Sequence, residues 1–240
     1  MKKLSIDTAE ELALRMRTEL RIGGSEPINM KTVLRQLNIL TIYRPLSEEI
    51  WRLSLKSRDG NMFMLVSSNA TRGSQHFTIA HELFHLFYDE HPHPHFSNKE
   101  MYMDVAERSA NLFASALLMP KEGLVYHIPE NELIDREISI DTALKLEQLF
   151  GVSHSTLVIR LQQLKFITTP KADWLMGLGI SKEAALRGID NALYYKGNEN
   201  LIIGDYGRKA KRLFDEERIS EGHYQELMRK IGYGESKDNS

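Results

Sequence analysis

The sequence predicts an α+β fold that is mostly helical, with a small β-sheet or hairpin, a helix-turn-helix-like segment and a C-terminal helical appendage. Two patterns indicate this fold class. Apolar residues recur at helical spacing over much of the chain, for example at Ala9, Ala13, Met16 and Leu20. One stretch, residues 51–66, instead has an alternating segment and an apolar run on either side of a turn, as paired strands do.

Composition narrows the class of protein further. The 240 residues carry a net charge of −2 and include no cysteine, so neither a general affinity for nucleic acid nor a disulfide framework is expected. The charged first residues lack the apolar core of a signal peptide, and no apolar run is long enough to span a membrane. We therefore expect a cytoplasmic protein with no membrane partner, in which any metal is held by His, Asp or Glu.

The N-terminal part of the chain is predicted to be scaffold. A capping-box pattern at residues 8–11 indicates a helix that ends near Leu20. Pro27 begins a second predicted helix that reaches about Leu37. Residues 38–43 then form a short predicted strand.

A β-hairpin is predicted next. Residues 51–56 alternate apolar and polar, Asp59 and Gly60 are a turn pair, and residues 62–66 are strongly apolar. An edge strand of such a hairpin can align an extended peptide through backbone hydrogen bonds. A sheet that only packs against a helix has the same pattern. Ser74 is the predicted N-cap of the helix that follows.

The most informative stretch is this helix, which has helical apolar spacing over residues 77–88 and the pattern H-E-x-x-H at residues 81–85. His81 and His85 lie one turn apart on one face, so both imidazoles can bind the same metal ion. Glu82 is placed to act as general base towards water at an open coordination position. Metal binding is favoured over two merely hydrogen-bonded histidines, because buried imidazoles beside a carboxylate are costly to desolvate without a shared partner.

A third ligand is expected on the next helix, which is predicted over residues 98–119. Glu107 lies on the apolar face of that helix, and a carboxylate directed at the core is unusual unless it is paired or bound to a metal. Asn111, one turn later, can hold a ligand by a hydrogen bond. His81, His85 and Glu107 would then form a two-histidine, one-glutamate site with one position open for water.

Two other residues compete for the third position. His91 stands ten residues after His81, which is the spacing of the third histidine in the pattern H-E-x-x-H-x-x-G-x-x-H. However, Tyr88 occupies the glycine position of that pattern and does not readily adopt the positive φ that turns the chain back. Asp104 lies one turn before Glu107 on a similar face. We therefore assign the third ligand to Glu107.

These residues resemble the ImmA/IrrE family of bacterial and phage metallopeptidases. The resemblance implies a zincin-like metallopeptidase core in which His81, His85 and Glu107 bind zinc, with manganese as the alternative, and Glu82 is the catalytic glutamate. The sequence departs from the family at Phe84, where glycine is usual. The resemblance extends to about residue 167 and rests on three runs: FTIAHELFH at 77–85, ERSANLFA at 107–114 and LLMP at 117–120.

The resemblance also implies a function. It is that of a zinc metalloendopeptidase that hydrolyses one peptide bond in a partner protein, a helix-turn-helix transcriptional repressor or antitoxin, and so releases genes under stress. Metal-activated water would attack the bond, with Glu82 as general base. Tyr126 and His127 are candidates, from a predicted loop, for the group that stabilises the second oxygen of the intermediate. A zinc hydrolase with a non-peptide substrate fits the same ligands.

Residues 139–167 have the apolar and glycine pattern of a helix-turn-helix, with Ser153 as N-cap of its second helix. That helix offers Arg160, Lys165 and two glutamines, which is little for phosphate binding. Glu147 occupies a position where the first helix of the motif has a small residue. We favour a scaffold or protein contact over DNA binding. The alternative function is a DNA- or partner-binding regulator with a non-proteolytic metal site.

The chain is predicted to divide after the helix-turn-helix-like segment. We expect a metallopeptidase domain over residues 1–168, a C-terminal helical regulatory or substrate-docking region over residues 169–233, and a disordered tail over residues 234–240. Within the C-terminal region, the patterns predict a helix over residues 181–195 and a helical hairpin over residues 205–231. The sequence does not indicate an oligomeric state.

Overall fold

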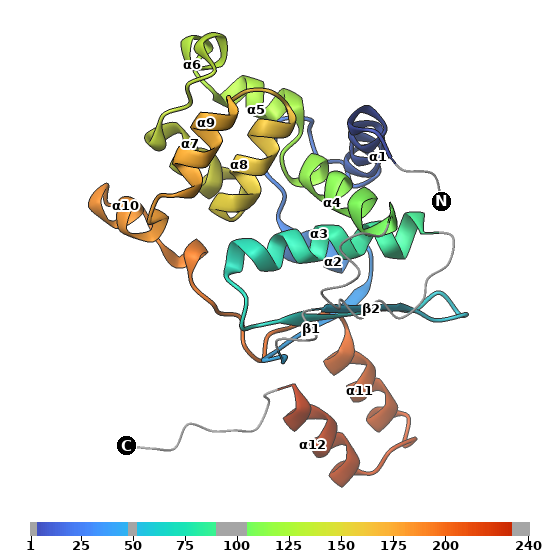
Figure 1. Cartoon of the computed structure of the whole chain (residues 1–240). Helices are drawn as coiled ribbons and strands as arrows, with labels where there is room; N and C mark the ends of the chain where they lie inside the picture. Colours follow the sequence, from blue (N-terminus) through green and yellow to red (C-terminus); the bar gives the residue numbers. More distant parts are fainter. Residues whose placement is uncertain (1–3, 48–51, 90–104, 232–240) are drawn as a thin grey trace.

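The computed structural model describes residues 4–47, 52–89 and 105–231. Helices predominate, and the described strands form one mixed four-stranded sheet, so the predicted α+β class is confirmed (Figure 1). Most helices lie on one side of the sheet, and a helical hairpin projects from the other side. No described helix combines the length and the apolar character needed to cross a membrane.

The sheet has the strand order β2-β3-β1-β4. β1 (Ile39–Arg44) runs parallel to β3 (Met62–Ser67), and β2 (Arg52–Lys56) runs antiparallel to β3. The predicted hairpin is therefore confirmed, and Gly60 in its turn has a φ of 80°, which glycine adopts without strain. β4 (Ile202–Ile203) pairs antiparallel with β1 at the edge opposite β2.

The first two helices begin at different residues from those predicted. In α1 (Ile6–Glu19) the N-cap is Ser5, whose Oγ accepts a hydrogen bond from the backbone N–H of Thr8 at 3.1 Å. The helix therefore begins before the predicted capping box. In α2 (Met30–Gln36) the N-cap is Asn29, so this helix begins after its predicted start. In each helix the N-cap side chain accepts a hydrogen bond from a backbone N–H of the first turn, and this determines where the helix begins.

α3 (Arg72–Tyr88) runs across one face of the sheet, which we call the inner face (Figure 1). Its N-cap is Thr71, whose hydroxyl accepts a hydrogen bond from the N–H of Ser74 at 3.3 Å, so the prediction of Ser74 as N-cap is wrong. α4 (Val105–Leu118) packs on α3, and residues 98–104, its predicted first turns, lie outside the described residues. The inner face carries the buried residues Ile39, Thr41, Tyr43, Ser54, Met64 and Val66.

The predicted helix-turn-helix geometry is present in the structure. α7 (Ile140–Phe150) ends at Gly151, which has a φ of 64°, and α8 (His154–Gln163) begins after Ser153. The hydroxyl of Ser153 accepts a hydrogen bond from the third residue beyond it, so its prediction as N-cap is confirmed. Two short helices connect α4 to α7: α5 (Lys121–His127) and α6 (Glu130–Asp135).

Two buried arginines hold the C-terminal end of α4. Arg17 Nη1 donates to the carbonyl of Leu117 at 2.6 Å, and Arg160 Nε donates to the carbonyl of Met119 at 3.1 Å. Carbonyls at a helix end lack partners within the helix, and cations there complement the helix dipole. Burial lowers the pKa of Arg17 to about 10, so the guanidinium stays charged at neutral pH. Arg160 points inward and is not available to a phosphate.

The C-terminal region contains shorter elements than predicted. The continuous helix predicted over residues 181–195 is wrong, because Gly188 adopts a φ of 66° and ends the helix. The predicted helical hairpin is confirmed, with the rings of Phe214 and Tyr224 stacked 5.0 Å apart. The helical elements here are α9 (Thr169–Met176), α10 (Ile180–Leu186), the 3₁₀ turn η2 (Ala192–Tyr194), α11 (Tyr206–Asp215) and α12 (Glu221–Lys230).

The same region also contributes to the sheet and to the start of α3. β4 lies within it, and the segment after η2 returns to α3. The backbone N–H of Arg72 donates to the carbonyl of Tyr195 at 3.0 Å. The buried amide of Gln75 donates to Gly197 O at 2.9 Å and accepts from Asn198 Nδ2 at 2.7 Å. The described part of this region, residues 169–231, is therefore not only helical, and it holds the first turns of α3.

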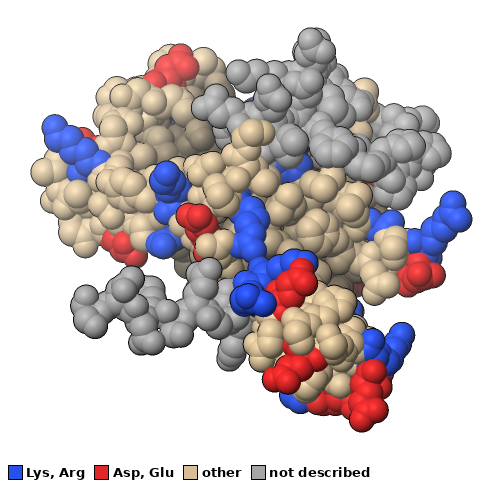
Figure 2. Space-filling view, turned by 90° about the horizontal axis from the view of Figure 1, so that it is seen from below, with Lys and Arg blue, Asp and Glu red and all other residues tan. Residues whose placement is uncertain are grey.

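Figure 2 shows the side of the molecule from which the α11–α12 hairpin projects. Lysine and arginine side chains are interspersed there with aspartate and glutamate. The described part of this side therefore has no continuous cationic surface of the kind that binds a nucleic acid backbone.

Candidate metal centre

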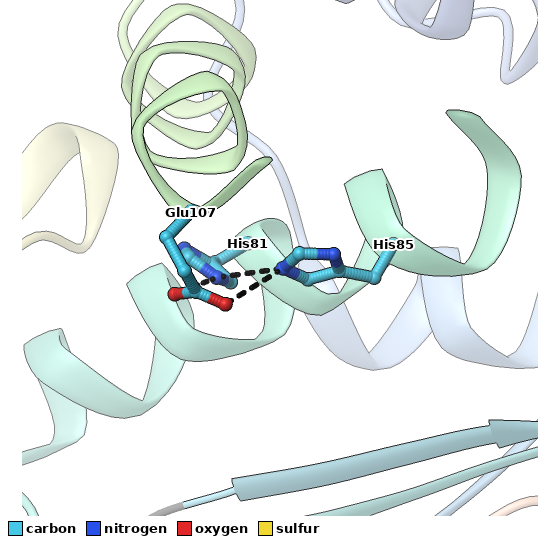
Figure 3. A group of neighbouring side chains, drawn as sticks. All are labelled: His81, His85 and Glu107. Atoms are coloured by element: carbon cyan, nitrogen blue, oxygen red, sulfur yellow. Dashed lines mark hydrogen bonds and ion pairs between the residues drawn. The ribbon is translucent and has the colours of Figure 1, made fainter. Parts of the chain in front are cut away.

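His81 and His85 from α3 and Glu107 from α4 converge between the two helices (Figure 3). One ligand atom of each residue lies within 4.8 Å of those of the other two. The two Nε2 atoms are 3.1 Å apart, and the Glu107 oxygens lie 3.3 Å from His81 Nε2 and 3.4 Å from His85 Nε2. All three side chains are buried. The structure thus brings together the three residues selected from sequence spacing.

Each histidine is oriented by a second hydrogen bond. His81 Nδ1 donates to Asn111 Oδ1 at 2.9 Å, and His85 Nδ1 donates to Asp89 Oδ2 at 3.1 Å. Both Nε2 atoms therefore face the space between the helices, as in metal-binding histidines whose other nitrogen is held by an acceptor. The hydrogen bond between Asn111 and His81 agrees with the prediction from the sequence. The contact of Asp89 was not predicted, although Asp89 stands one helical turn after His85.

The electrostatics of the group suit a metal ion. Burial, and then the charge of Arg52, lower the pKa of His81 to about 3, so this imidazole stays neutral. Burial raises the pKa of Glu107, but its contacts with His81 and His85 and the charge of Arg52 outweigh burial and hold that pKa far below its usual range. Burial lowers the pKa of His85, but its bond to Glu107 and the nearby carboxylates outweigh it, so the net shift is upward.

The chemistry of the three side chains also fits a metal ion. Two imidazole nitrogens and one carboxylate oxygen are the protein ligands of many catalytic zinc sites, which keep one position open. Glu82 lies beside this group and is fully buried. Its Oε1 has no hydrogen-bond partner among the described residues, although it makes an ion pair. A carboxylate buried beside such a group is suited to accept a proton from water.

Comparison with known families supports the same interpretation. A family model described as the IrrE N-terminal-like domain of the M78 peptidases matches residues 34–162, which is more than half of the chain. The chain belongs to the M78 peptidase family. The predicted family is therefore confirmed, and the M78 chain is a metallopeptidase that acts on protein and has a group of residues suited to a divalent metal. No curated protein matches the chain.

Glu82 of the M78 chain has two neighbours on β2. Ser54 Oγ donates a hydrogen bond to Glu82 Oε2, and Arg52 Nε lies 2.7 Å from Glu82 Oε1. Arg52 Nη2 also donates to Glu107 Oε2 at 2.6 Å. Burial raises the pKa of Glu82, and the charge of Arg52 opposes this, with a net upward shift. The carboxylate is therefore a stronger base than one on the surface.

Arg52 and Ser54 do not stand out in the sequence. In an alternating strand, the apolar Leu53 and Leu55 would be expected to face the core. The register with β3 places Ser54 opposite the buried Met64, so the polar side of β2 faces α3. The sequence signal was the hairpin turn, which fixes this register.

Other residues considered in the sequence do not join the group. Tyr126 and His127 lie on α5 and not in a loop, and Tyr126 is 77% exposed. The described ring contacts of His127 are with Tyr126 and Phe150. His91 and Asp104, the competitors for the third position, lie outside the described residues.

Phe84, the departure from the family pattern, fills space between α3 and α4. Its side chain is 1% exposed, and its ring centroid lies 5.6 Å from that of Phe113 and 5.9 Å from that of Tyr88. Contacts at these distances are typical of packed aromatic pairs. The larger residue therefore adds to the helix–helix contact that places Glu107 opposite the histidines.

Proposed function

We propose that this M78 metallopeptidase is a zinc-dependent, site-specific endopeptidase that cleaves a peptide bond in a partner protein. The convergence of His81, His85 and Glu107 next to the buried Glu82 carries this proposal. In this assignment the first three residues hold the ion, and Asn111 fixes the orientation of His81. Zinc suits two imidazoles and one carboxylate, and manganese is the alternative ion.

A divalent ion at this position would polarise the scissile carbonyl and make a water molecule more acidic. Glu82 takes the proton from the attacking water as the new C–O bond forms. It then passes this proton to the nitrogen of the leaving amine as the C–N bond breaks. The burial of Glu82 supports this role, because its raised pKa lets it hold the proton between the two steps.

The position of β2 supports an extended peptide as substrate. Among the described strands, β2 pairs only with β3, so its other edge has no described partner strand. β2 also lies beside α3, as the hydrogen bond from Ser54 to Glu82 shows. A peptide that adds to this edge by backbone hydrogen bonds would pass close to the proposed general base.

The partner protein is inferred from the family resemblance of residues 77–120. On that basis we infer that the substrate is a helix-turn-helix repressor or an antitoxin. Its cleavage relieves the repression of genes under stress. We further infer that the enzyme works in the cytoplasm. The inward position of Arg160 on α8 argues against the alternative function, a DNA-binding regulator.

The test uses the variant Glu82→Gln as a trap. This variant keeps the proposed ligands and loses the base, so it should bind zinc and retain an uncut substrate. Proteins that co-purify with it are then incubated with the zinc-loaded wild type. We expect one partner to be cut at a single position, and a chelator to abolish the cut.

Glu137→Gln is the matched control, because Glu137 is exposed and its ion pair is with Lys171 and not with a residue of the metal centre. It should cleave the partner as the wild type does. A ladder of products would indicate a general protease instead. Full activity of Glu82→Gln would refute the assignment of the base.

A further inference from the structure

The inner side of β2 presents three polar side chains to α3. Ser54 bonds to Glu82, Arg52 reaches both Glu82 and Glu107, and Lys56 Nζ donates to the carbonyl of Leu86 at 3.4 Å. These residues alternate along the strand, so they share one side of it. Only Arg52 and Ser54 touch the residues of the metal centre.

Arg52 connects the proposed base to the proposed third ligand. Its Nε lies 2.7 Å from Glu82 Oε1, and its Nη2 lies 2.6 Å from Glu107 Oε2. The side chain is 11% exposed, and those of Glu82 and Glu107 are 0% and 6% exposed. The guanidinium therefore lies between two carboxylates that come from different helices.

Buried carboxylates repel each other strongly because the protein interior screens charge poorly. A planar guanidinium has donors in a fixed fork, so it can set both the distance and the orientation of two anions. Ser54 adds a hydrogen bond to the other oxygen of Glu82. Both oxygens of the proposed base are thus held from one strand, and Arg52 ties the base to Glu107.

We propose that Arg52 and Ser54 are positioning residues that hold Glu82 and Glu107 at a fixed separation for peptide hydrolysis. The proposal rests on the proposed function. It assigns to β2 a part in the active site in addition to any contact with substrate. It also explains why the polar side of this strand, and not its leucine side, faces the core.

The test compares Arg52→Ala, Arg52→Lys and Ser54→Ala with the matched control Lys56→Ala. Lys56 lies on the same side of the same strand and contacts α3, but it touches neither carboxylate. Urea unfolding of each variant verifies that the chain is folded. Each variant is then titrated with Co²⁺, whose visible absorption reports the geometry of the ligands. Cleavage of the trapped partner at saturating zinc gives kcat and KM.

We expect Arg52→Ala to bind Co²⁺ with a changed spectrum and to lose about 10- to 100-fold in kcat with little change in KM. Arg52→Lys should recover part of this loss, because it keeps the charge and lacks the fork. Ser54→Ala should lose less than Arg52→Ala. Lys56→Ala should match the wild type in spectrum and in rate.

The proposal is overturned if folded Arg52→Ala has the spectrum and kcat of Lys56→Ala. It is also overturned if its loss appears only in KM. Failure of the proposed function would look different, because the wild type itself would then cut no partner. The Co²⁺ spectra require no substrate, so in that case an unchanged spectrum of Arg52→Ala still overturns the positioning role.

Discussion

Gly73 of α3 lies against the backbone of Ser153, the N-cap of α8. A Cβ atom at Gly73 would lie 2.6 Å from the backbone nitrogen of Ser153, closer than such atoms can approach. Nearby, His76 Nδ1 donates to the carbonyl of Gly151 at 2.8 Å. The helix that carries both proposed histidine ligands therefore rests directly on the turn of the helix-turn-helix-like segment. That segment supports the candidate metal centre.

This contact predicts the effect of Gly73→Ala. The added methyl meets backbone atoms and cannot be relieved by rotating a side chain, so α3 or the turn must shift. We expect a loss of about 1–3 kcal/mol in the free energy of unfolding, measured in urea. Gly222→Ala is the control, since Gly222 is the second residue of α12, as Gly73 is of α3, and a Cβ there meets nothing within 4 Å. Equal stability of the two variants would contradict the contact.

Asn111 is predicted to affect metal affinity through His81. The variant Asn111→Leu removes the acceptor for His81 Nδ1 and leaves the imidazole free to rotate or change tautomer. We expect zinc affinity to fall by about tenfold or more, measured by competition with a chromogenic chelator. Asn111→Asp keeps an acceptor and should bind zinc at least as well as the wild type. Wild-type affinity in Asn111→Leu would show that the bond does not orient the ligand.

The helical residues of the candidate metal centre could be predicted to lie together because their signals are local. The one-turn spacing of His81 and His85 and the apolar face that includes Glu107 follow from helical periodicity alone. The roles of Arg52 and Ser54 could not be predicted in this way. They depend on which side of β2 meets α3, and the leucines of that strand favoured the opposite choice.

Long-range pairing also limited the prediction of the fold. β4 has only two residues, Ile202 and Ile203, and its partner β1 is far away in the sequence. Such a short run has no periodicity of its own. Gly188 had a visible signal, because glycine often ends helices, but the apolar residues on both sides of it favoured one continuous helix.

Truncation tests whether the chain can be divided after residue 168. A chain of residues 1–168 lacks β4 and leaves the buried amide of Gln75 without Gly197 and Asn198. An unsatisfied buried group costs about 1–3 kcal/mol, and an exposed edge of β1 adds to this. We expect this chain to lose cooperative unfolding in urea and to bind zinc weakly.

A chain of residues 1–204 is the matched control for this truncation. It keeps β4 and the contacts of Gln75 and removes only the α11–α12 hairpin and the tail. It should unfold cooperatively and bind zinc. If residues 1–168 fold and bind zinc equally well, the C-terminal region is a separate appendage.

His154 is predicted to make stability depend on pH. Its Nδ1 lies 2.6 Å from Glu147 Oε1, and its Nε2 lies 2.8 Å from the carbonyl of Leu175, so both ring nitrogens face acceptors. Burial lowers the pKa of His154, but the hydrogen bond and charge of Glu147 outweigh burial and raise it above the ordinary value of 6.5. The charged form therefore stabilises the fold below about pH 6.5, and this contribution is lost as pH rises through the higher folded pKa.

The measurement compares wild type with His154→Gln in urea at a series of pH values. The wild type should be more stable by about 2 kcal/mol near pH 6, and the difference should shrink towards about pH 9. His223→Gln, at an exposed histidine of α12, should follow the wild type at every pH. A difference that grows with pH would mean that His154 is neutral in the folded chain.

The central claim is that one metal ion is held by His81, His85 and Glu107, with Glu82 beside it. Anomalous scattering from crystals grown with zinc, recorded on both sides of the zinc absorption edge, tests it most directly. We predict one strong peak at about 2.0–2.2 Å from both Nε2 atoms and from a Glu107 oxygen. A peak bound by His91 in place of Glu107, or no peak between α3 and α4, would contradict the account.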